Sequence, residues 1–278
     1  MSTSIDTNSP ALYARERASR ASRMPFLAQV AMLARRALVV NLRVPAVIVP
    51  PLIISVFFLL VNNAQLGGVA NVFLRGQKYV NFILPLSVMN AALAGASVPG
   101  QTIVADIERG YFDKPMLTPV SRWALLLAPM LAGGIVLVLQ TVSMLVLGLV
   151  LGVDPATGML GLLAMLGFAL LLGIGFSGLP VGIALLTGSP AATGGASFLF
   201  FPLTFLTATY VPLDRLSGWF RTATQLNPIT YPLEAMRGIL STGWDVVLIT
   251  RGLVAGAGLF AVSFAFALYG LRIRTRRR

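Results

Sequence analysis

Long apolar stretches alternate with short polar ones along most of this chain. A helix needs about 20 apolar residues to cross the ~30 Å hydrocarbon core of a bilayer. By that measure the pattern predicts six spanning helices, at 44–62, 79–99, 123–152, 158–187, 193–212 and 250–271. The sequence therefore predicts an all-α integral membrane protein with six transmembrane helices.

Two further segments are predicted ahead of the first span. Residues 1–23 are polar and contain several Ser and Arg residues, so we expect them to be disordered. Residues 25–43 predict a weakly amphipathic helix in the plane of the membrane interface, with Arg side chains reaching the headgroups. Its candidate functional residues are Gln29, Arg35, Arg36 and Arg43. Gln29, Arg36 and Arg43 share one face because they are seven residues apart. The alternative is a helical continuation of the first span.

Composition and charge support the membrane assignment. The chain is 56% hydrophobic and 11% charged, whereas soluble domains carry about 25% charged residues. Its net charge of +12 comes from 21 Lys and Arg against 9 Asp and Glu. Such an excess can indicate nucleic-acid binding. Here, however, the basic residues lie at both ends of the chain and beside apolar stretches, as topology signals do. No nucleic-acid partner is therefore expected.

The distribution of basic residues between loops predicts the orientation. The N-terminal region, the 99–122 loop and the C-terminal end hold 15 of the 21 Lys and Arg residues. Loops with this excess stay in the cytoplasm. Both termini are therefore predicted to be cytoplasmic, and the basic tail 273–278 is expected to touch anionic lipid.

Several kinds of site are excluded by missing residue types. The chain has no Cys and no His, so we expect no disulfide and no metal site. It has no Lys followed by Ser or Thr, which a phosphate-binding loop needs. Gly175-Phe-Ser-Gly178 matches the pattern of rhomboid-type intramembrane serine proteases. That chemistry needs a histidine to activate the serine, and the chain has none. We instead expect Gly178 and Gly182, with the same spacing at 148–152 and 252–256, to permit close helix contacts.

The spans also argue against an ion-driven carrier. Such carriers place ionisable residues at membrane depth, whereas Asp and Glu are absent from the centres of all six predicted spans. Asn90 and Gln140 are the main polar residues there, and bonding between helices is the favoured role for them. Energy for uphill transport is then expected from another subunit.

Residues 213–249 are predicted to form an external pair of short helices, Leu213–Thr224 and Pro228–Leu240, that dip into the outer leaflet. Asn227 is expected to cap the second helix, with Pro228 at its first position. Glu234 and Arg237 are three apart and are expected to pair. The alternative is a structural outer loop without a ligand role.

A charged island between the second and third spans, 106–122, carries the most specific signal. Gly110 permits a break, and the prolines limit any long helix, so we predict a short elbow parallel to the membrane. The elbow offers charged groups and apolar side chains to a soluble partner. The alternative is a solvated loop whose charges pair with each other. The candidate partner-binding residues are Asp106, Glu108, Arg109, Gly110, Tyr111, Phe112, Met116, Leu117, Pro119 and Arg122.

Two motifs give a family resemblance. Glu108-Arg-Gly, followed by Leu117-Thr-Pro-Val-Ser-Arg122-Trp, resembles the signature of type 2 ABC exporter permeases, both daunorubicin-type and polysaccharide-export permeases. The segment from Asn227-Pro to Glu234-Ala-Met-Arg237 resembles the external motif of the same family. The likeness runs from about residue 24 to the end of the last span, which implies a transporter domain over 24–272.

The resemblance implies a mechanism. The chain would not be an enzyme but a permease in the bacterial inner membrane, working as a homodimer or heterodimer with two copies of a separate ATPase. ATP and Mg would bind the ATPase, and none would bind this chain. The segment Asp106–Pro119 would be the coupling helix seated in an ATPase cleft, and the helix near 25–43 would also contact the ATPase. The cargo would be hydrophobic or amphipathic, a drug-like compound or a lipid. The alternatives are a polysaccharide-export permease, a secondary carrier and a membrane scaffold.

Overall fold

The computed structural model describes residues 24–68, 78–111, 120–207, 213 and 216–276. These residues form helices and connecting turns, without a strand among them. The predicted disordered segment 1–23 and the tail's last two residues lie outside the described residues. The helices are α2 (Phe26–Leu42), α3 (Pro45–Leu66), α5 (Tyr79–Gly95), α6 (Val98–Glu108), α7 (Arg122–Val150), α8 (Gly158–Thr187), α9 (Pro190–Phe198), α10 (Phe200–Phe205), α11 (Gly218–Leu226), α12 (Thr230–Ser241) and α13 (Val246–Arg276).

Five helical stretches in the described part of the chain are long and apolar enough to cross a bilayer. They are Ile48–Leu66, Tyr79–Glu108, Trp123–Val150, Gly158–Thr187 and Val246–Arg276. These stretches coincide with five of the six predicted spans. The remaining predicted span, 193–212, is occupied by α9 and α10, which are 9 and 6 residues long and too short to cross singly. Residues 208–212 of that span lie outside the described residues.

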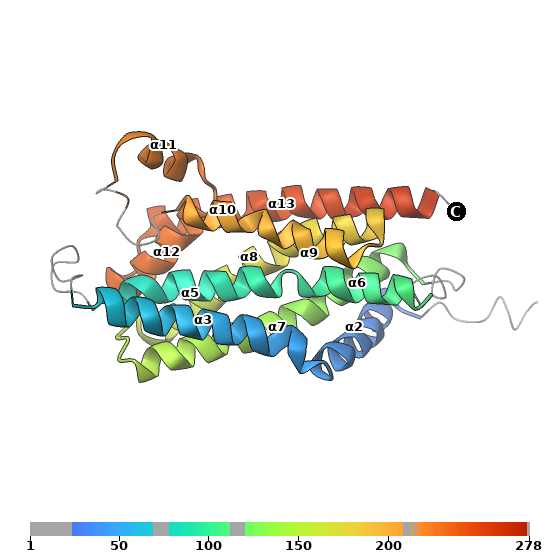
Figure 1. The fold of residues 1–278 in the computed structure, drawn as a ribbon, viewed down its shortest axis with the longest axis horizontal. Coiled ribbons are helices and arrows are strands. Elements are labelled where there is room, and N and C mark those ends of the chain that lie inside the picture. Colours follow the sequence, from blue (N-terminus) through green and yellow to red (C-terminus); the bar gives the residue numbers. More distant parts are fainter. Residues whose placement is uncertain (1–23, 69–77, 112–119, 208–212, 214–215, 277–278) are drawn as a thin grey trace, which may run out of the picture.

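The second predicted span is the centre of the bundle. In the most apolar window of Tyr79–Glu108, 83% of the residues are buried, against 11% for Ile48–Leu66 in α3. Helix α5 packs against α3, α7, α8 and α12 (Figure 1). Helix α3 turns Ile53, Phe57 and other large apolar side chains outward. The second span is therefore enclosed by other helices, whereas the apolar surface of the first span is available to lipid or to another subunit.

Glycines bring α8 and α13 close together, as the spacing predicted. A Cβ at Gly178 would overlap the backbone of Ser263, and one at Gly182 would overlap the ring of Phe266. From the other side, a Cβ at Gly270 would lie 2.8 Å from the carbonyl oxygen of Gly182. Only residues without a Cβ allow this approach of two helix backbones.

The other two glycine pairs differ from each other. Gly252 faces Ala235 of α12, and Gly256 faces Leu171 of α8, so both members of that pair are contact positions. Gly148 meets Leu84 of α5, but Gly152 has φ +85° and turns the chain after α7. The expectation of a helix contact is therefore wrong for Gly152, where the glycine serves the turn.

Two helix breaks lie near each other along the bundle axis (Figure 1). One separates α2 from α3 at Arg43–Val44, and the other separates α5 from α6 at Ala96–Ser97. The Thr102 hydroxyl of α6 donates to the Asn41 side-chain oxygen of α2 over 3.0 Å. Helix α2 is therefore a separate element joined to α6, and not the start of α3.

The bundle has two distinct ends (Figure 1). At the α2 end lie α2, the end of α6 and the C-terminal turns of α13, where Arg274 donates to the Leu185 carbonyl of α8. At the α12 end lie α12 and the start of α5, where Lys78 donates to the Gly152 carbonyl. Two short helices, α11 and α12, are present where a helical pair was predicted, but the first begins at Gly218 and not at Leu213. Helix α11 projects from the rest of the bundle (Figure 1).

Candidate functional site

Helix α6 ends as the sequence predicted, at a glycine. Gly110 has φ +65°, which favours a residue without a Cβ. Its N–H bonds the carbonyl of Ile107 over 3.0 Å, and the N–H of Tyr111 bonds the carbonyl of Asp106 over 2.8 Å. This pair of hydrogen bonds is the Schellman ending of a helix. The chain direction after α6 is therefore fixed locally.

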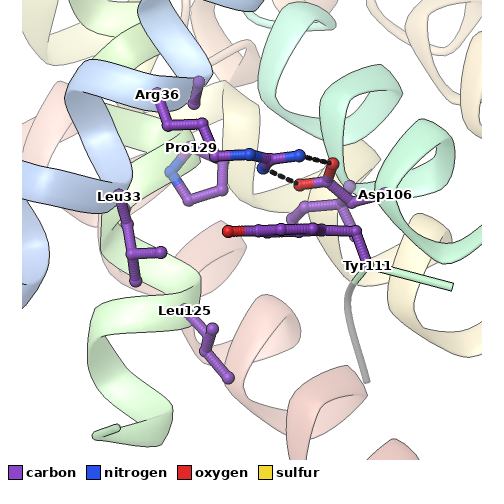
Figure 2. A pocket seen from close by; sticks show the side chains of 9 residues that line it. Leu33, Arg36, Asp106, Tyr111, Leu125 and Pro129 are labelled. Atoms are coloured by element: carbon purple, nitrogen blue, oxygen red, sulfur yellow. Dashed lines mark hydrogen bonds and ion pairs between the residues drawn. The ribbon is translucent and has the colours of Figure 1, made fainter. Parts of the chain in front are cut away.

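Asp106 is held by α2 and does not face outward. The Arg36 guanidinium donates two hydrogen bonds to the Asp106 carboxylate, over 2.9 and 2.8 Å (Figure 2). The same guanidinium stacks on the Tyr111 ring, 3.4 Å from its centroid. The hydrogen bond to Asp106 raises the pKa of Arg36 above its ordinary value, so the group is charged at any physiological pH. This bidentate, stacked geometry is specific to arginine.

Gln29 ties the same helix to the start of α7. Its side-chain oxygen accepts the backbone N–H of Ser121 over 2.8 Å, and its side-chain nitrogen donates to the Met24 carbonyl over 2.7 Å. Gln29 is buried, on the face that it was predicted to share with Arg36 and Arg43. The expectation that the Arg side chains reach the headgroups is wrong for Arg36, which binds Asp106. Arg35 and Arg43 are exposed.

A small pocket lies between α2, α6 and α7 beside the ion pair. Figure 2 shows Leu33, Leu125 and Pro129 around the Arg36–Asp106–Tyr111 group. The pair is thus bordered by apolar side chains, which reduces screening by water and strengthens the attraction.

Two charged residues of the island remain open. Glu108 and Arg109, at the last turn of α6, are both exposed at the α2 end. Phe112, Met116, Leu117 and Pro119 lie outside the described residues, and Arg122 is the first residue of α7. The described part of the island therefore divides into an inner group, Asp106 and Tyr111, and an outer group, Glu108 and Arg109.

The external motif joins elements at the opposite end. The Asn227 side-chain nitrogen donates to the carbonyls of Leu203 and Leu206, and its oxygen accepts the N–H of Ile229. Helix α12 begins at Thr230 and its N-cap is Ile229. The predictions that Asn227 is the cap and Pro228 the first helical residue are therefore wrong by two residues. Asn227 fixes the turn that leads into α12 and links it to the end of α10.

The predicted pair of Glu234 and Arg237 is confirmed, with 2.9 Å between Glu234 Oε1 and Arg237 Nη1. The sequence did not indicate that Arg237 is 5% exposed. Its Nε donates to the Phe82 carbonyl of α5, and its guanidinium lies 3.7 Å from the centroid of the Phe82 ring. Burial lowers the pKa of Arg237, and Glu234 opposes that shift. The external motif is therefore a link between α12 and the central helix.

Asn227→Asp tests this link by a nearly isosteric change. The ionised carboxylate would face two carbonyl oxygens at a position only 4% exposed, and we expect a loss of about 2–3 kcal/mol of stability. The apparent melting temperature in detergent should fall. The deficit should shrink from about pH 8 to about pH 5, because burial raises the folded-state pKa of such a carboxyl and the protonated form can donate again.

Gln225→Glu is the matched control, since it makes the same chemical change at an exposed side chain of α11. An equal fall in melting temperature for both variants would contradict the role of Asn227.

Comparison with known proteins gives one family. Residues 28–241 match the family described as ABC-2 type transporter. The chain is 26% identical to a probable doxorubicin resistance ABC transporter permease protein, DrrC, of Mycobacterium tuberculosis, over 85% of this chain and 86% of the relative. It is also 26% identical to the daunorubicin resistance ABC transporter permease protein DrrB1 of Streptomyces coeruleorubidus, over 82% and 80%.

The family match includes α2, the charged island and the external motif, and it covers most of the bundle. Together with the apolar helices, it identifies a multi-pass membrane protein that serves as the membrane subunit of an ABC transporter. The chain belongs to the ABC-2 type transporter family.

Proposed function

We propose that this chain is the permease subunit of an ATP-driven exporter in the bacterial cytoplasmic membrane, carrying a hydrophobic or amphipathic compound such as a drug or lipid. The relatives' names, which state doxorubicin and daunorubicin resistance, support this cargo class. The basic residues gathered at the α2 end support a cytoplasmic location for that end. If the permease has six spans, the fifth is the segment 193–212, in which α9 and α10 cross the membrane together with the residues that follow them.

The observation that carries the proposal is the exposed pair Glu108 and Arg109 on a helix end of fixed direction. The Schellman ending of α6 and the Arg36–Asp106 pair leave these two charges facing outward. An acid and a base on a helix end of fixed direction suit a partner protein, because the backbone that carries them loses little conformational entropy on binding. We assign this surface to the ATPase, with two ATPase copies serving a pair of permeases.

Coupling is mechanical in this proposal. ATP-driven closure of the ATPase pair displaces the coupling segments and shifts the permease between inward-open and outward-open states. This shift requires the ATPase to bind the two states with different affinity. The outward-facing apolar side chains of α3 support a membrane-embedded contact with a second permease, which is either a copy of this chain or a relative.

Combined substitution of Glu108→Ala and Arg109→Ala tests the assignment. We expect the protein to insert normally while substrate export falls about tenfold, the effect of losing ~1.4 kcal/mol at the contact. The measurement is efflux of a fluorescent anthracycline from cells that express the permease and its ATPase, together with the amount of ATPase that co-purifies.

The matched control is Asp154→Ala with Arg221→Ala, which removes one acid and one base from exposed positions. Asp154 lies beside the start of α5, where its carbonyl accepts from Asn81, and Arg221 is in α11. Unchanged export by the Glu108/Arg109 variant would overturn the assigned surface. Transport by the chain alone, driven by a proton gradient, would replace the proposal with a secondary carrier.

A further inference from the structure

The second span keeps one narrow stripe open to its surroundings. Between positions 82 and 104 every residue is buried except four, which are Asn90, Ala94, Ser97 and Gln101. These residues follow one another at spacings of four, three and four, so they lie along one side of the helix. The residues at the α5–α6 break keep right-handed helical backbone angles. The open stripe is therefore continuous from near the middle of the span towards the α2 end.

The residue types on the open stripe do not suit lipid. A helix face turned to hydrocarbon carries large apolar side chains, as α3 does with Ile53 and Phe57. The open stripe instead carries two amides, a hydroxyl and a methyl group. A polar side chain that faces hydrocarbon without a partner is costly, and polar residues at membrane depth mark transport pathways. The open stripe therefore faces something more polar than acyl chains.

The two amides of the open stripe have no partners inside the permease. In the described part of the chain, neither the Asn90 nor the Gln101 side chain forms a hydrogen bond. Gln140 bonds between helices as predicted, because its side-chain nitrogen donates to the Ile48 carbonyl over 3.4 Å. The same expectation is not met by Asn90 among the described residues. Each of the two amides therefore has a donor and an acceptor to offer to another molecule.

Glycines of α9 border the open stripe on one side. Helix α6 packs against α9, and a Cβ at Gly194 would lie 3.5 Å from the Gln101 side-chain nitrogen. The next residue, Gly195, is exposed, and a Cβ there would meet no heavy atom within 4 Å. On the other side lies α3, which packs against α5 (Figure 1). The open stripe thus lies between the first span and α9, and α9 places no side chain at these two positions.

We propose that the open stripe is the cargo-facing side of the second span, and that Asn90 and Gln101 are specificity-determining residues. The inference rests on the proposed function and narrows its cargo class. A neutral amide suits uncharged groups that donate or accept hydrogen bonds, such as hydroxyl and carbonyl groups. The cargo is thus an amphipathic compound that carries several such groups, and not a plain hydrocarbon chain. The two amides are about 16 Å apart along the helix, so they engage the cargo at successive positions.

The competing occupant of the open stripe is a second permease packed against it. The contact proposed above between permeases uses the large apolar side chains of α3, which lie outside the open stripe. Amides packed against a partner helix would be closed to water. A cargo path that opens to the cytoplasm in the inward-open state admits water. The two occupants therefore differ in whether a water-soluble reagent reaches the open stripe.

The first test is labelling of single cysteines by a water-soluble methanethiosulfonate reagent, in membranes that contain the permease and its ATPase. The chain has no cysteine of its own, so each label reports one position. We expect reaction in the four variants Asn90→Cys, Ala94→Cys, Ser97→Cys and Gln101→Cys. Daunorubicin should slow the reaction at positions 90 and 101 about fivefold or more.

Ile53→Cys is the matched control for labelling, because its position on α3 is exposed but faces lipid or a second permease. It should stay unreactive. An unreactive open stripe would overturn the inference in favour of lipid or a packed permease. Reaction rates that daunorubicin leaves unchanged would also overturn it, since the open stripe would then hold water without cargo.

The second test removes the two amides while nearly keeping their size. Asn90→Leu and Gln101→Met are each expected to raise the KM for daunorubicin export about fivefold, because one hydrogen bond to the cargo is lost. The kcat should change less than twofold. Gln101→Asn keeps an amide and should have an intermediate KM. A merely structural role would lower the amount of folded protein and leave the KM unmoved.

Asn62→Leu is the matched control for these variants, since it removes an amide from a partly exposed position of α3. Its KM should equal that of the unchanged permease. If the unchanged permease exports daunorubicin but Asn90→Leu and Gln101→Met behave like Asn62→Leu, the inference is overturned and the exporter stands. If the unchanged permease with its ATPase exports no anthracycline, the proposed function itself fails.

Discussion

Replacing Gly178 with leucine is expected to disrupt the packing of α8 against α13 and to remove most of the correctly folded protein. A Cβ at this position would overlap the carbonyl group of Ser263, and the backbone nitrogen of Phe264 lies 2.9 Å from it. These atoms belong to the α13 backbone, so the clash cannot be relieved by a change of side-chain rotamer. Overpacking of this kind costs about 3 kcal/mol, which is a large share of a typical total stability of about 5–15 kcal/mol.

Gly167→Leu is the matched control for this variant, because it adds the same side chain to the same helix. No heavy atom lies within 4 Å of a Cβ at Gly167, and the residue is exposed. The yield of monodisperse protein in mild detergent and the apparent melting temperature should fall for Gly178→Leu and stay near the unchanged values for Gly167→Leu. Equal behaviour of the two variants would show that the close approach of α8 and α13 is not needed for folding.

The sequence predicted the five long apolar helices because a single physical requirement dictates them. A segment that crosses hydrocarbon must be long and apolar and must satisfy its own backbone hydrogen bonds. The glycine spacing at Gly178 and Gly182 predicted a close helix contact for a similar reason, since backbones can approach only where side chains are absent; it did not indicate that α13 is the partner. Both signals are contained within one segment, and neither depends on knowing which segments are neighbours.

The polar contacts were less predictable because each depends on two segments far apart in the chain. The seven-residue spacing placed Gln29 and Arg36 on one face, as the structure has them, but it did not show what that face meets. Their partners, Ser121 and Asp106, are 92 and 70 residues away. A polar face on an interfacial helix predicts headgroup contact when no protein partner is known. Here the protein supplies the partners, and the bonds they form replace those to water and headgroups.

The external motif shows the same limit. Glu234 and Arg237 lie one turn apart on a helix, so their pairing followed from local geometry. The contact between Arg237 and Phe82 links residues 155 apart, and no local pattern indicates it. The only local signal was an arginine one turn from a glutamate in α12, which suits either an exposed face or a buried, paired site.

Removing Glu234 is expected to destabilise the protein more than replacing both members of its pair. Glu234→Ala would leave the Arg237 guanidinium buried against Phe82 without its carboxylate. Breaking a buried pair in this way costs about 3–5 kcal/mol. We expect the lower part of that range, because the Glu234 side chain is 26% exposed and water can reach its site. The double replacement Glu234→Leu with Arg237→Met removes both charges and keeps apolar volume, so its cost should be much smaller.

The measurement is the apparent melting temperature of the three proteins in one detergent, with Arg221→Ala as a control for loss of an exposed arginine. The expected order of stability is the unchanged protein and the control first, then the double replacement, then Glu234→Ala. This order follows because a buried charge that has lost its carboxylate partner costs more than an uncharged contact in its place. If Glu234→Ala were as stable as the double replacement, the Arg237 charge would not depend on the Glu234 carboxylate, and its contacts with the carbonyl and ring of Phe82 would suffice to hold it.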